Sequence, residues 1–302
     1  MNILITGASG FVGQYLVNFF LKRKFNVSSL GRSKVSNVKN YTLPKKWSKN
    51  DLVNIILEAK PDYLFHLAGN SQSNSCLESF NINTCFGLNL LDALSASGFS
   101  EKTKCLFFGS ASEYGMVKDI DSPLSESFNC KPYACYGIGK LAQTHYAATW
   151  GKLNGQIVII RPFTILGKHM SEKMAIGSFA KQINEISTKG DKGVLYTGNI
   201  DISRDFIDVS DVVEICWKLV NLDEANSQVI NICSGKPTSL REVVDYMINL
   251  TGVDISIQVE GKRLVQADVK THFGENKKLL GLVGNFEFIP WQVSVKKMLE
   301  AS

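Results

Sequence analysis

The sequence predicts an α/β protein with a doubly wound parallel (Rossmann) sheet and a smaller α/β substrate-binding lobe. Apolar runs alternate with segments of helical periodicity up to Phe163, which is the pattern of a parallel sheet with crossover helices. A glycine-rich turn joins the first apolar run to the first helical segment. After Phe163 the alternation loosens, and short helices mix with short strands.

The first expected unit is a strand at Asn2–Thr6 followed by a helix at Gly10–Lys22, where apolar residues recur at helical spacing. Either Ser48 or Asn50 caps the second helix. The other expected strands of this region are Val27–Leu30, Asp62–Ala68, Thr103–Ser110 and Gly155–Phe163, and its other helices are Ser48–Ala59, Ser75–Ala96 and Tyr136–Trp150.

The second region carries shorter elements and no Pro- or Ser-rich linker, repeat or low-complexity tract. We expect a cofactor-binding domain of residues 1–163 plus about 198–235, interleaved with a substrate-binding lobe of residues 164–197 and 236–302. The helices expected after Phe163 are Ala175–Ile186, Val209–Leu222 and Leu240–Leu250, and the strands expected there are Gly193–Tyr196, Gln228–Cys233 and Ser256–Val259.

The composition narrows the class of protein. Of 302 residues, 44% are apolar, which is enough for a substantial core. The 33 basic and 28 acidic residues give a net charge of +5, which suits a phosphorylated ligand and is too small to indicate nucleic-acid binding. We expect no membrane span, because no apolar run is long enough.

The seven cysteines include no CxxC pair, and their odd number suits reduced thiols better than a disulfide framework. Cys130 and Cys135 are the closest pair, and no matching histidines lie near them, so we expect no metal site. The chain enters a strand at Asn2 without a signal peptide, so we expect a cytoplasmic protein.

The stretch LITGASGFVGQYL places Gly7, Gly10 and Gly13 at the first strand–helix junction. A helix N-terminus offers free N–H groups and positive dipole charge, and glycines let a pyrophosphate approach the backbone. Glycine-rich turns also occur for structural reasons, and the commoner fingerprint is GxGxxG. We expect a dinucleotide to contact the three glycines together with Ser9, Phe11 and Val12.

The residues at the end of the second expected strand indicate which of the two nicotinamide cofactors the protein binds. An acidic residue there would bind the ribose hydroxyls of NAD, whereas this chain has Gly31, Arg32 and Ser33. Gly31 leaves room, and Arg32 and Ser33 suit a 2′-phosphate. We therefore expect NADP(H); the alternative is that Arg32 is a solvated loop cation.

Tyr136 and Lys140 stand at i and i+4, one turn apart on one helix face. A free tyrosine has a pKa of ~10, and a nearby ammonium lowers it. The YxxxK spacing alone is weak evidence for a catalytic pair, because two side chains on an exposed helix surface often have the same spacing. Ser110 ends a strand, where open α/β sheets bind ligands, so it is a candidate to polarise a substrate carbonyl; a turn or helix-cap hydroxyl is the alternative.

Six motifs occur in order: GxxGxxG, HLAG at His66–Gly69, Asn83 in NINTCFGLNLL, Ser110 in GSASEYG, Tyr136–Lys140, and RPF at Arg161–Phe163. Together they resemble the extended short-chain dehydrogenase/reductases of the NAD-dependent epimerase/dehydratase family that act on nucleotide sugars. The resemblance implies a Ser110–Tyr136–Lys140 active site. It also implies a homodimer formed through the two long helices, and cofactor contacts from Leu67, Ala68, Asn83 and Pro162.

The segments Gly198–Val213 and Gly261–Leu279 resemble the GDP-mannose 4,6-dehydratase group, and most closely its GDP-6-deoxy-4-keto-mannose reductases. This resemblance implies that Arg204 and Arg263 hold the diphosphate of a nucleotide-diphosphate sugar. The alternative is that each pairs with a neighbouring aspartate. Val265 stands where the family often has another arginine. We expect further substrate contacts from Ser112, Thr164 and Phe179, although an aromatic in an amphipathic helix is more often core.

The dehydratases of this group place a glutamate two residues before the tyrosine of their YG motif; here that position is Ser112, and Glu113 is one residue out of register. We therefore expect NADPH-dependent reduction of the C4 keto group of a nucleotide-linked 4-keto-6-deoxyhexose, with a GDP-linked sugar favoured. Tyr136 would donate the proton, Lys140 would lower its pKa, and Ser110 would polarise the carbonyl. A C4 epimerase with tightly bound NAD and a non-catalytic dinucleotide-binding sensor are the alternatives.

Overall fold

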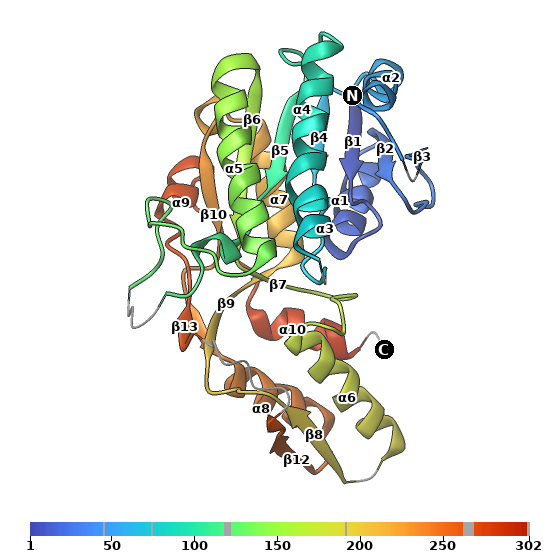
Figure 1. The fold of residues 1–302 in the computed structure, drawn as a ribbon. Coiled ribbons are helices and arrows are strands. Elements are labelled where there is room, and N and C mark those ends of the chain that lie inside the picture. The colour runs from blue at the N-terminus through green and yellow to red at the C-terminus, as the bar shows by residue number, and fades with distance from the viewer. Residues whose placement is uncertain (45, 74, 118–121, 191, 262–268, 301–302) are drawn as a thin grey trace.

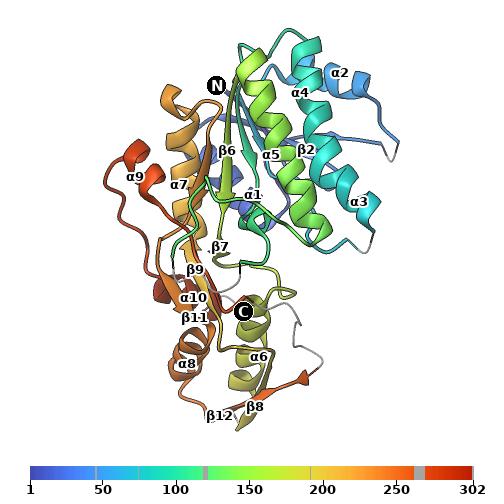
Figure 2. The ribbon, with the colours of Figure 1, turned by 60° about the vertical axis from the view of Figure 1, so that its left-hand side comes forward.

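The computed structural model describes residues 1–44, 46–73, 75–117, 122–190, 192–261 and 269–300. A large parallel sheet with helices on both faces forms one lobe, and a smaller lobe lies beyond one end of its strands (Figure 1). The second view shows the same division (Figure 2), with α6, α8, β8 and β12 gathered in the smaller lobe.

The seven strands of the large sheet are ordered β10-β6-β5-β4-β1-β2-β3, and every neighbouring pair is parallel. The predicted doubly wound sheet is therefore confirmed. The order turns back at β1, and open sheets of this kind bind ligands at such a point, outside the carboxyl ends of the strands. The strands are β1 (Asn2–Thr6), β2 (Asn26–Gly31), β3 (Lys39–Thr42), β4 (Tyr63–His66), β5 (Lys104–Phe108), β6 (Gln156–Pro162) and β10 (Val229–Ile232).

Helices bury both faces of this sheet, and strand β1 shows how. Ile3 and Ile5 join the core that includes residues of α1 (Phe11–Lys22) and α7 (Val209–Val220). Leu4 joins the opposite core, whose helices are α2 (Lys49–Ala59), α4 (Phe86–Ala96) and α5 (Cys135–Asn154). Alternation along a strand sends successive side chains to opposite faces. Both faces are therefore apolar, as the continuous apolar runs predict.

Ser48 is the residue that caps α2, which decides between the two candidates. Its hydroxyl accepts a hydrogen bond from the backbone N–H of Asp51, and the Asp51 carboxylate accepts one from the backbone N–H of Ser48. This reciprocal pair satisfies two of the backbone groups that a helix N-terminus leaves without partners.

The smaller lobe has its own apolar core and two small sheets. Strands β7, β9, β11 and β13 form one sheet, and β8 and β12 form the other. The elements of these sheets and the helices around them are β7 (Thr164–Leu166), α6 (Ala175–Lys189), β8 (Gly193–Thr197), β9 (Ser203–Asp208), β11 (Pro237–Ser239), α8 (Leu240–Thr251), β12 (Ile255–Val259), β13 (Thr271–His272) and α10 (Trp291–Leu299). Two further short helices, η3 (Asp223–Ala225) and α9 (Lys277–Val283), each place a residue in the core of the large sheet. Over the described ranges, no helix has the length and apolar character to cross a membrane.

The chain passes between the lobes more than once. On β9, Phe206 belongs to the core of the smaller lobe, whereas its neighbour Ile207 belongs to the core of the large sheet. Leu279 of α9 also packs in the core of the large sheet, although it lies in the segment that we assigned to the substrate lobe. The expected division into 1–163 with 198–235 and 164–197 with 236–302 remains a proposal.

The segment Ser75–Ala96 departs from the continuous helix that its periodicity predicts. It forms α3 (Cys76–Phe80), a π-helical turn η1 (Asn81–Cys85) and then α4. Inside this turn Asn83 is buried and hydrogen-bonds both backbone groups of Asn70, at 2.8 and 3.0 Å. Such turns add a residue to a helix and are frequent at functional sites.

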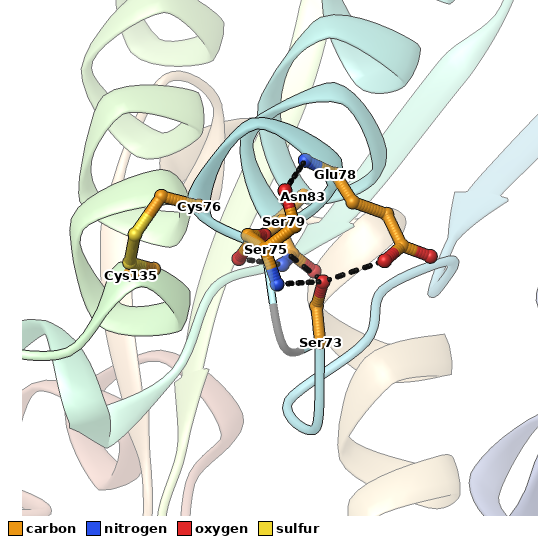
Figure 3. The surroundings of a disulfide bond; sticks show 7 residues. All are labelled: Ser73, Ser75, Cys76, Glu78, Ser79, Asn83 and Cys135. Atoms are coloured by element: carbon orange, nitrogen blue, oxygen red, sulfur yellow. Dashed lines mark hydrogen bonds between the residues drawn. A yellow bond between two sulfur atoms is a disulfide. The ribbon is translucent and has the colours of Figure 1, made fainter.

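Cys76 and Cys135 form a disulfide, so the expectation that the cysteines are all reduced thiols is wrong (Figure 3). The bond joins the first residues of α3 and α5, whose Cα atoms lie 5.4 Å apart. The two cysteines are 59 residues apart in the sequence, and only the packing of α3 beside α5 brings them together. Cys135 directly precedes Tyr136.

The disulfide predicts a thiol count and a change in stability. Denatured, unreduced protein should titrate five free thiols, the residues Cys85, Cys105, Cys130, Cys216 and Cys233, and reduced protein should titrate all seven. Because the bond restrains the unfolded chain, Cys76→Ser should lower the free energy of unfolding by about 2–4 kcal/mol. Chemical denaturation of the unreduced proteins measures this, with Cys130→Ser as the control. Seven thiols in the unreduced protein would contradict the bond.

The glycine turn predicts a second effect on stability. A Cβ added at Gly13 would collide with the carbonyl oxygen of Gly7 and the backbone of Ala8, whereas one added at Gly281 would meet no atom within 4 Å. Gly13→Ala should therefore destabilise the protein by about 1–3 kcal/mol, and Gly281→Ala in α9 should not. Thermal unfolding of the two variants compares them, and equal midpoints would contradict the close approach.

Candidate active site

A cleft of about 680 Å³ lies at the carboxyl edge of the large sheet, where the smaller lobe meets it. Helix α1, the segments after β4, β5 and β6, helix α5 and strand β9 all contribute to its wall. Segments far apart in the sequence thus converge at the place where open α/β sheets bind ligands. The predicted site residues that line the cleft are Phe11, Val12, Leu67, Ser110, Ser112, Tyr136, Lys140, Pro162, Thr164 and Arg204.

The glycine turn brings the start of α1 against the ends of β1 and β4. Gly7 has φ +69°, and a Cβ there would collide with the backbone of Leu67 and Ala68. Helix α1 begins after Gly10 with no side-chain cap and no acidic residue in its first turn. Its first N–H groups and the positive end of its dipole therefore suit an anion such as a pyrophosphate. Ser9 lies in the same turn, next to Gly10.

The second strand ends beside the first, with which it pairs in parallel. Arg32 and Ser33 follow the last residue of β2 and are exposed. A Cβ at Gly31 would meet nothing within 4 Å, so the backbone here leaves open space. The structure thus provides a cation and a hydroxyl at the tip of β2, with room for a ligand group beside them.

Asn83 and Ala68 do not line the cleft themselves, but they contact or belong to the loop after β4 that does. The amide of Asn83 fixes the loop after β4 through Asn70, and a Cβ on Gly69 would meet Asn83 Oδ1 at 2.9 Å. The backbone N–H of Ala68 donates to the hydroxyl of Thr6 at 3.2 Å. Both residues therefore shape the loop whose Gly69, Ser71 and Gln72 line the cleft.

Ser110 stands at the turn after β5 and has two roles in the structure. It is the N-cap of the 3₁₀ turn η2 (Ala111–Tyr114), where its hydroxyl accepts from the N–H of Ser112 at 3.1 Å. It also lines the cleft beside Tyr136, and a hydrogen bond with Ser110 lowers the pKa of that tyrosine. The cap interpretation is therefore confirmed, and the active-site role of Ser110 remains a prediction that its place in the cleft wall allows.

Tyr136 is a protonated phenol in this site. Burial raises its pKa above the usual 10, Glu113 raises it further, and the hydrogen bond with Ser110 opposes both. These three causes are the ones that set the pKa of Tyr136 in this structure. Lys140 Nζ donates to the carbonyl of Phe108 at 2.7 Å, and the lowering of the tyrosine pKa by its ammonium remains a prediction.

Burial lowers the pKa of Lys140 itself to about 8. Its side chain is only 2% exposed and reaches the cleft from α5, one turn after Tyr136. Lys140 and Gln143 both donate to the Phe108 carbonyl, at 2.7 and 3.1 Å. The carboxyl end of β5 and the helix that carries the tyrosine are therefore held together.

Glu113 is turned away from the cleft, as its position out of register predicts. It is fully buried and pairs with Arg161 at 2.7 Å. The segment that carries Glu113 is the 3₁₀ turn η2, in which successive side chains point in different directions. Among the described residues that line the cleft there is no aspartate or glutamate.

Two predicted substrate residues lie elsewhere. Phe179 is 4% exposed and packs in the core of the smaller lobe, so the expected substrate contact from it is wrong. It shares the apolar face of α6 with Ile176, Ala180 and Ile183. Arg263 lies outside the described residues. Arg204 lines the cleft and donates to the carbonyls of Ser203 and Val269 at 2.8 and 2.9 Å.

Several cleft residues were not predicted. They come from loops and short strands that carry no motif, so only the folded chain reveals them. Burial and the charge of Arg204 lower the pKa of His272, on β13, to about 4, and it is neutral near pH 7. The unpredicted side chains of the cleft include Gln72, Tyr133, Met170, Ser171, Met174 and His272.

Curated relatives and a solved structure match this chain over nearly its full length. The chain is 29% identical to GDP-6-deoxy-D-mannose reductase of Pseudomonas aeruginosa, over 99% of this chain and 95% of the relative. It is 28% identical to GDP-6-deoxy-D-talose 4-dehydrogenase of Aggregatibacter actinomycetemcomitans, over 99% and 96%. A solved structure of RMD from Pseudomonas aeruginosa with NADPH superposes with a TM-score of 0.84 and 26% identity, over 100% and 98% of the two chains.

The family model described as NAD dependent epimerase/dehydratase family matches residues 3–233, which include the glycine turn, Ser110, Tyr136 and Lys140. The chain therefore belongs to the NAD dependent epimerase/dehydratase family, and so to the extended short-chain dehydrogenase/reductases that its ordered motifs resemble.

Proposed function

We propose that this protein reduces the C4 keto group of a nucleotide-linked 4-keto-6-deoxyhexose with NADPH, and that the nucleotide is GDP. The observation that carries this proposal is the cleft itself. It places the protonated phenol of Tyr136 beside Ser110 and carries no carboxylate on its described lining. The names of the two full-length relatives, both GDP-6-deoxyhexose oxidoreductases, support the substrate class.

The residues at the cofactor end of the cleft fit NADP(H). The uncapped N-terminus of α1 would hold the pyrophosphate, and Arg32 with Ser33 would hold the 2′-phosphate. Phe11, Val12 and Leu67 line the wall that leads to Lys140. When bound, the cofactor supplies the hydride for the keto carbon. The bound NADPH of the similar Pseudomonas structure supports this choice.

Side chains of the protein would supply the proton for O4 of the sugar and a hydrogen bond to the same oxygen. Tyr136, protonated because burial raises its pKa, donates its proton to O4 of the sugar. Ser110 donates a hydrogen bond to the same oxygen and polarises the carbonyl. Lys140, which lines the cleft one turn after Tyr136, would position the ribose of the cofactor.

The substrate end of the cleft fits a sugar diphosphate. Arg204 lies on β9 at the wall formed by the smaller lobe, and guanidinium groups suit phosphate oxygens. Ser112 and Thr164 place hydroxyls along the path to Tyr136. We expect Arg263 to add a second cation to this grip.

Dehydration across C5 and C6 would need a further acid–base pair, and Glu113, three residues after Ser110, pairs with Arg161 instead. A C4 epimerase would use the same serine, tyrosine and lysine. It would retain NAD tightly, so the choice of cofactor separates the two reactions. A dinucleotide-binding sensor would not turn over any nucleotide sugar.

We further propose that the enzyme is a cytoplasmic homodimer that supplies a 6-deoxyhexose donor for surface polysaccharide. Leu77 and Phe80 of α3 and Ile138, Tyr146 and Leu153 of α5 are large apolar side chains with 45–76% of their surface exposed. Exposed apolar groups on neighbouring helices are typical of protein–protein interfaces. They support pairing through these helices, which the family resemblance implies.

The direct test mixes purified protein with GDP-4-keto-6-deoxymannose and NADPH and follows the absorbance of the reduced nicotinamide. We expect oxidation of NADPH, and a loss of about 10²–10⁴-fold in kcat for Tyr136→Phe, because the proton donor is removed. Cofactor affinity of this variant should stay unchanged. Full activity of Tyr136→Phe would refute the assignment.

If NADPH is not oxidised with this substrate or with its CDP and dTDP counterparts, the reductase proposal fails. Mass spectrometry of the nucleotide released from denatured protein would then examine the epimerase alternative. Retained NAD together with interconversion of C4 epimers would establish that alternative.

The cofactor preference has its own test. Arg32→Ala should weaken NADPH binding by about 10–100-fold, since a hydrogen bond to a charged group contributes about 1.5–3 kcal/mol. It should leave NADH binding nearly unchanged, and Arg23→Ala, an exposed cation on the far end of α1, serves as the control. Fluorescence titration of the wild type and the two variants with each cofactor measures the six dissociation constants. An equal loss for both cofactors would contradict recognition of the 2′-phosphate.

A further inference from the structure

Behind Ser110, a carboxylate is fully enclosed by the protein. Glu113 lies on η2 and has 0% of its surface exposed. Its Oε1 accepts hydrogen bonds from the backbone N–H of Ser110 at 2.9 Å and from the hydroxyl of Thr144 at 3.0 Å. Its Oε2 accepts from Arg161 Nε at 2.7 Å. Both oxygens are thus occupied, and one of them holds the backbone of Ser110 directly.

The cation of this pair connects the carboxylate to the rest of the sheet edge. Arg161, near the end of β6, has only 5% of its side chain exposed. Its Nη1 donates to the hydroxyl of Tyr114 and to the carbonyl of Glu126, both at 3.4 Å. The Tyr114 hydroxyl donates to Asn231 Oδ1 on β10 at 2.6 Å. Glu113 therefore joins the turn after β5 to α5, β6 and β10.

The backbone beside Ser110 is shaped around the carboxylate. A Cβ on Gly109 would collide with Glu113 Oε1 and with the carbonyl of Ile160. The N–H of Gly109 donates to that same carbonyl at 2.7 Å. Glycine thus lets β5 end close against β6 while the carboxylate fills the space above it, and Ser110 is displayed to the cleft from this fixed point.

The charges around Tyr136 give the carboxylate a second effect. On its own helix, Lys140 is held by the Phe108 carbonyl. Arg161 pairs with Glu113 at 2.7 Å and does not line the cleft, and Tyr114 is neutral because burial raises its pKa. Across the cleft stand Arg204 and the neutral His272. The negative charge that acts on the phenol is that of Glu113, which raises its pKa.

We propose that Glu113 is a positioning residue of this active site, which holds Ser110 toward the substrate oxygen and adds a negative charge behind the phenol of Tyr136. The role rests on the proposed reductase function, in which Tyr136 gives its proton to O4. It differs from that of a dehydratase glutamate, because the Glu113 carboxylate is turned away from the cleft and does not touch the substrate.

The first measurement titrates Tyr136 without substrate or cofactor. The ultraviolet absorbance of tyrosinate is followed against pH, and the same titration of the Tyr136→Phe form of each protein is subtracted. Glu113→Gln should lower the pKa of Tyr136, because it removes the negative charge and keeps the shape of the side chain. Asp211→Asn is the matched control: Asp211 is also a buried carboxylate, accepts from the N–H of Ile289 at 2.8 Å and does not line the cleft.

An unchanged Tyr136 pKa in Glu113→Gln, or an equal fall in Asp211→Asn, would overturn the proposal. If Glu113→Gln fails to fold, the double variant Glu113→Gln with Arg161→Gln leaves no unpaired charge inside the protein. It should also lower the pKa of Tyr136, by less than Glu113→Gln alone because the cation is removed together with the carboxylate. An unchanged value there would also overturn the proposal.

The second measurement is the pH profile of kcat with the keto sugar and NADPH. The loss of kcat at high pH, where Tyr136 loses its proton, should begin at lower pH in Glu113→Gln than in the wild type. Glu113→Ala, which also removes the acceptor for the Ser110 N–H, should lower kcat by a further tenfold or so. If kcat of Glu113→Ala equals that of Glu113→Gln, Ser110 is not held by this carboxylate. A chain that reduces no keto sugar would refute the proposed function, while the titration would still test Glu113.

Discussion

A carboxylate leaves water at a cost of several kcal/mol unless a cation and hydrogen bonds replace the solvent. Glu113 meets this condition with Arg161, the hydroxyl of Thr144 and the N–H of Ser110. Each partner comes from a different element, so the charge can be satisfied only when β5, β6 and α5 stand in one arrangement. That arrangement is also the one that displays Ser110 and Tyr136 to the cleft.

The rest of the site follows from the carboxyl edge of the parallel sheet. The turn after β1 presents helix N–H groups, the end of β2 presents Arg32, and β9 presents Arg204 on the far wall. These groups attract phosphates, whereas the centre of the cleft holds a neutral phenol and hydroxyls. A cleft with positive groups at both ends and a proton donor in the middle suits the reduction of a ketone on a diphosphate sugar.

The sequence predicts the buried strands and the cleft motifs because both depend on local pattern. It misses β3 (Lys39–Thr42), where Tyr41 is the one buried residue of the strand, and the π-turn inside Ser75–Ala96. It also misses partners set by packing. Glu113 and Arg161 stand 48 residues apart, and no spacing rule joins them. Phe179 shows the opposite kind of error, because the sequence predicts a substrate contact that the structure does not have. An aromatic residue on an amphipathic helix has the same spacing whether it packs in a core or binds a ligand.

The most direct test of the account uses NADPH carrying deuterium at C4 of the nicotinamide, with GDP-4-keto-6-deoxymannose as substrate. The isolated sugar nucleotide is then examined by mass spectrometry and by NMR at C4. The account predicts one deuterium at C4 of the sugar for each NADPH oxidised when the transferred position is labelled. Sugar nucleotide that is recovered unreduced, or that is reduced at C4 without deuterium by a nicotinamide retained through purification, would contradict it.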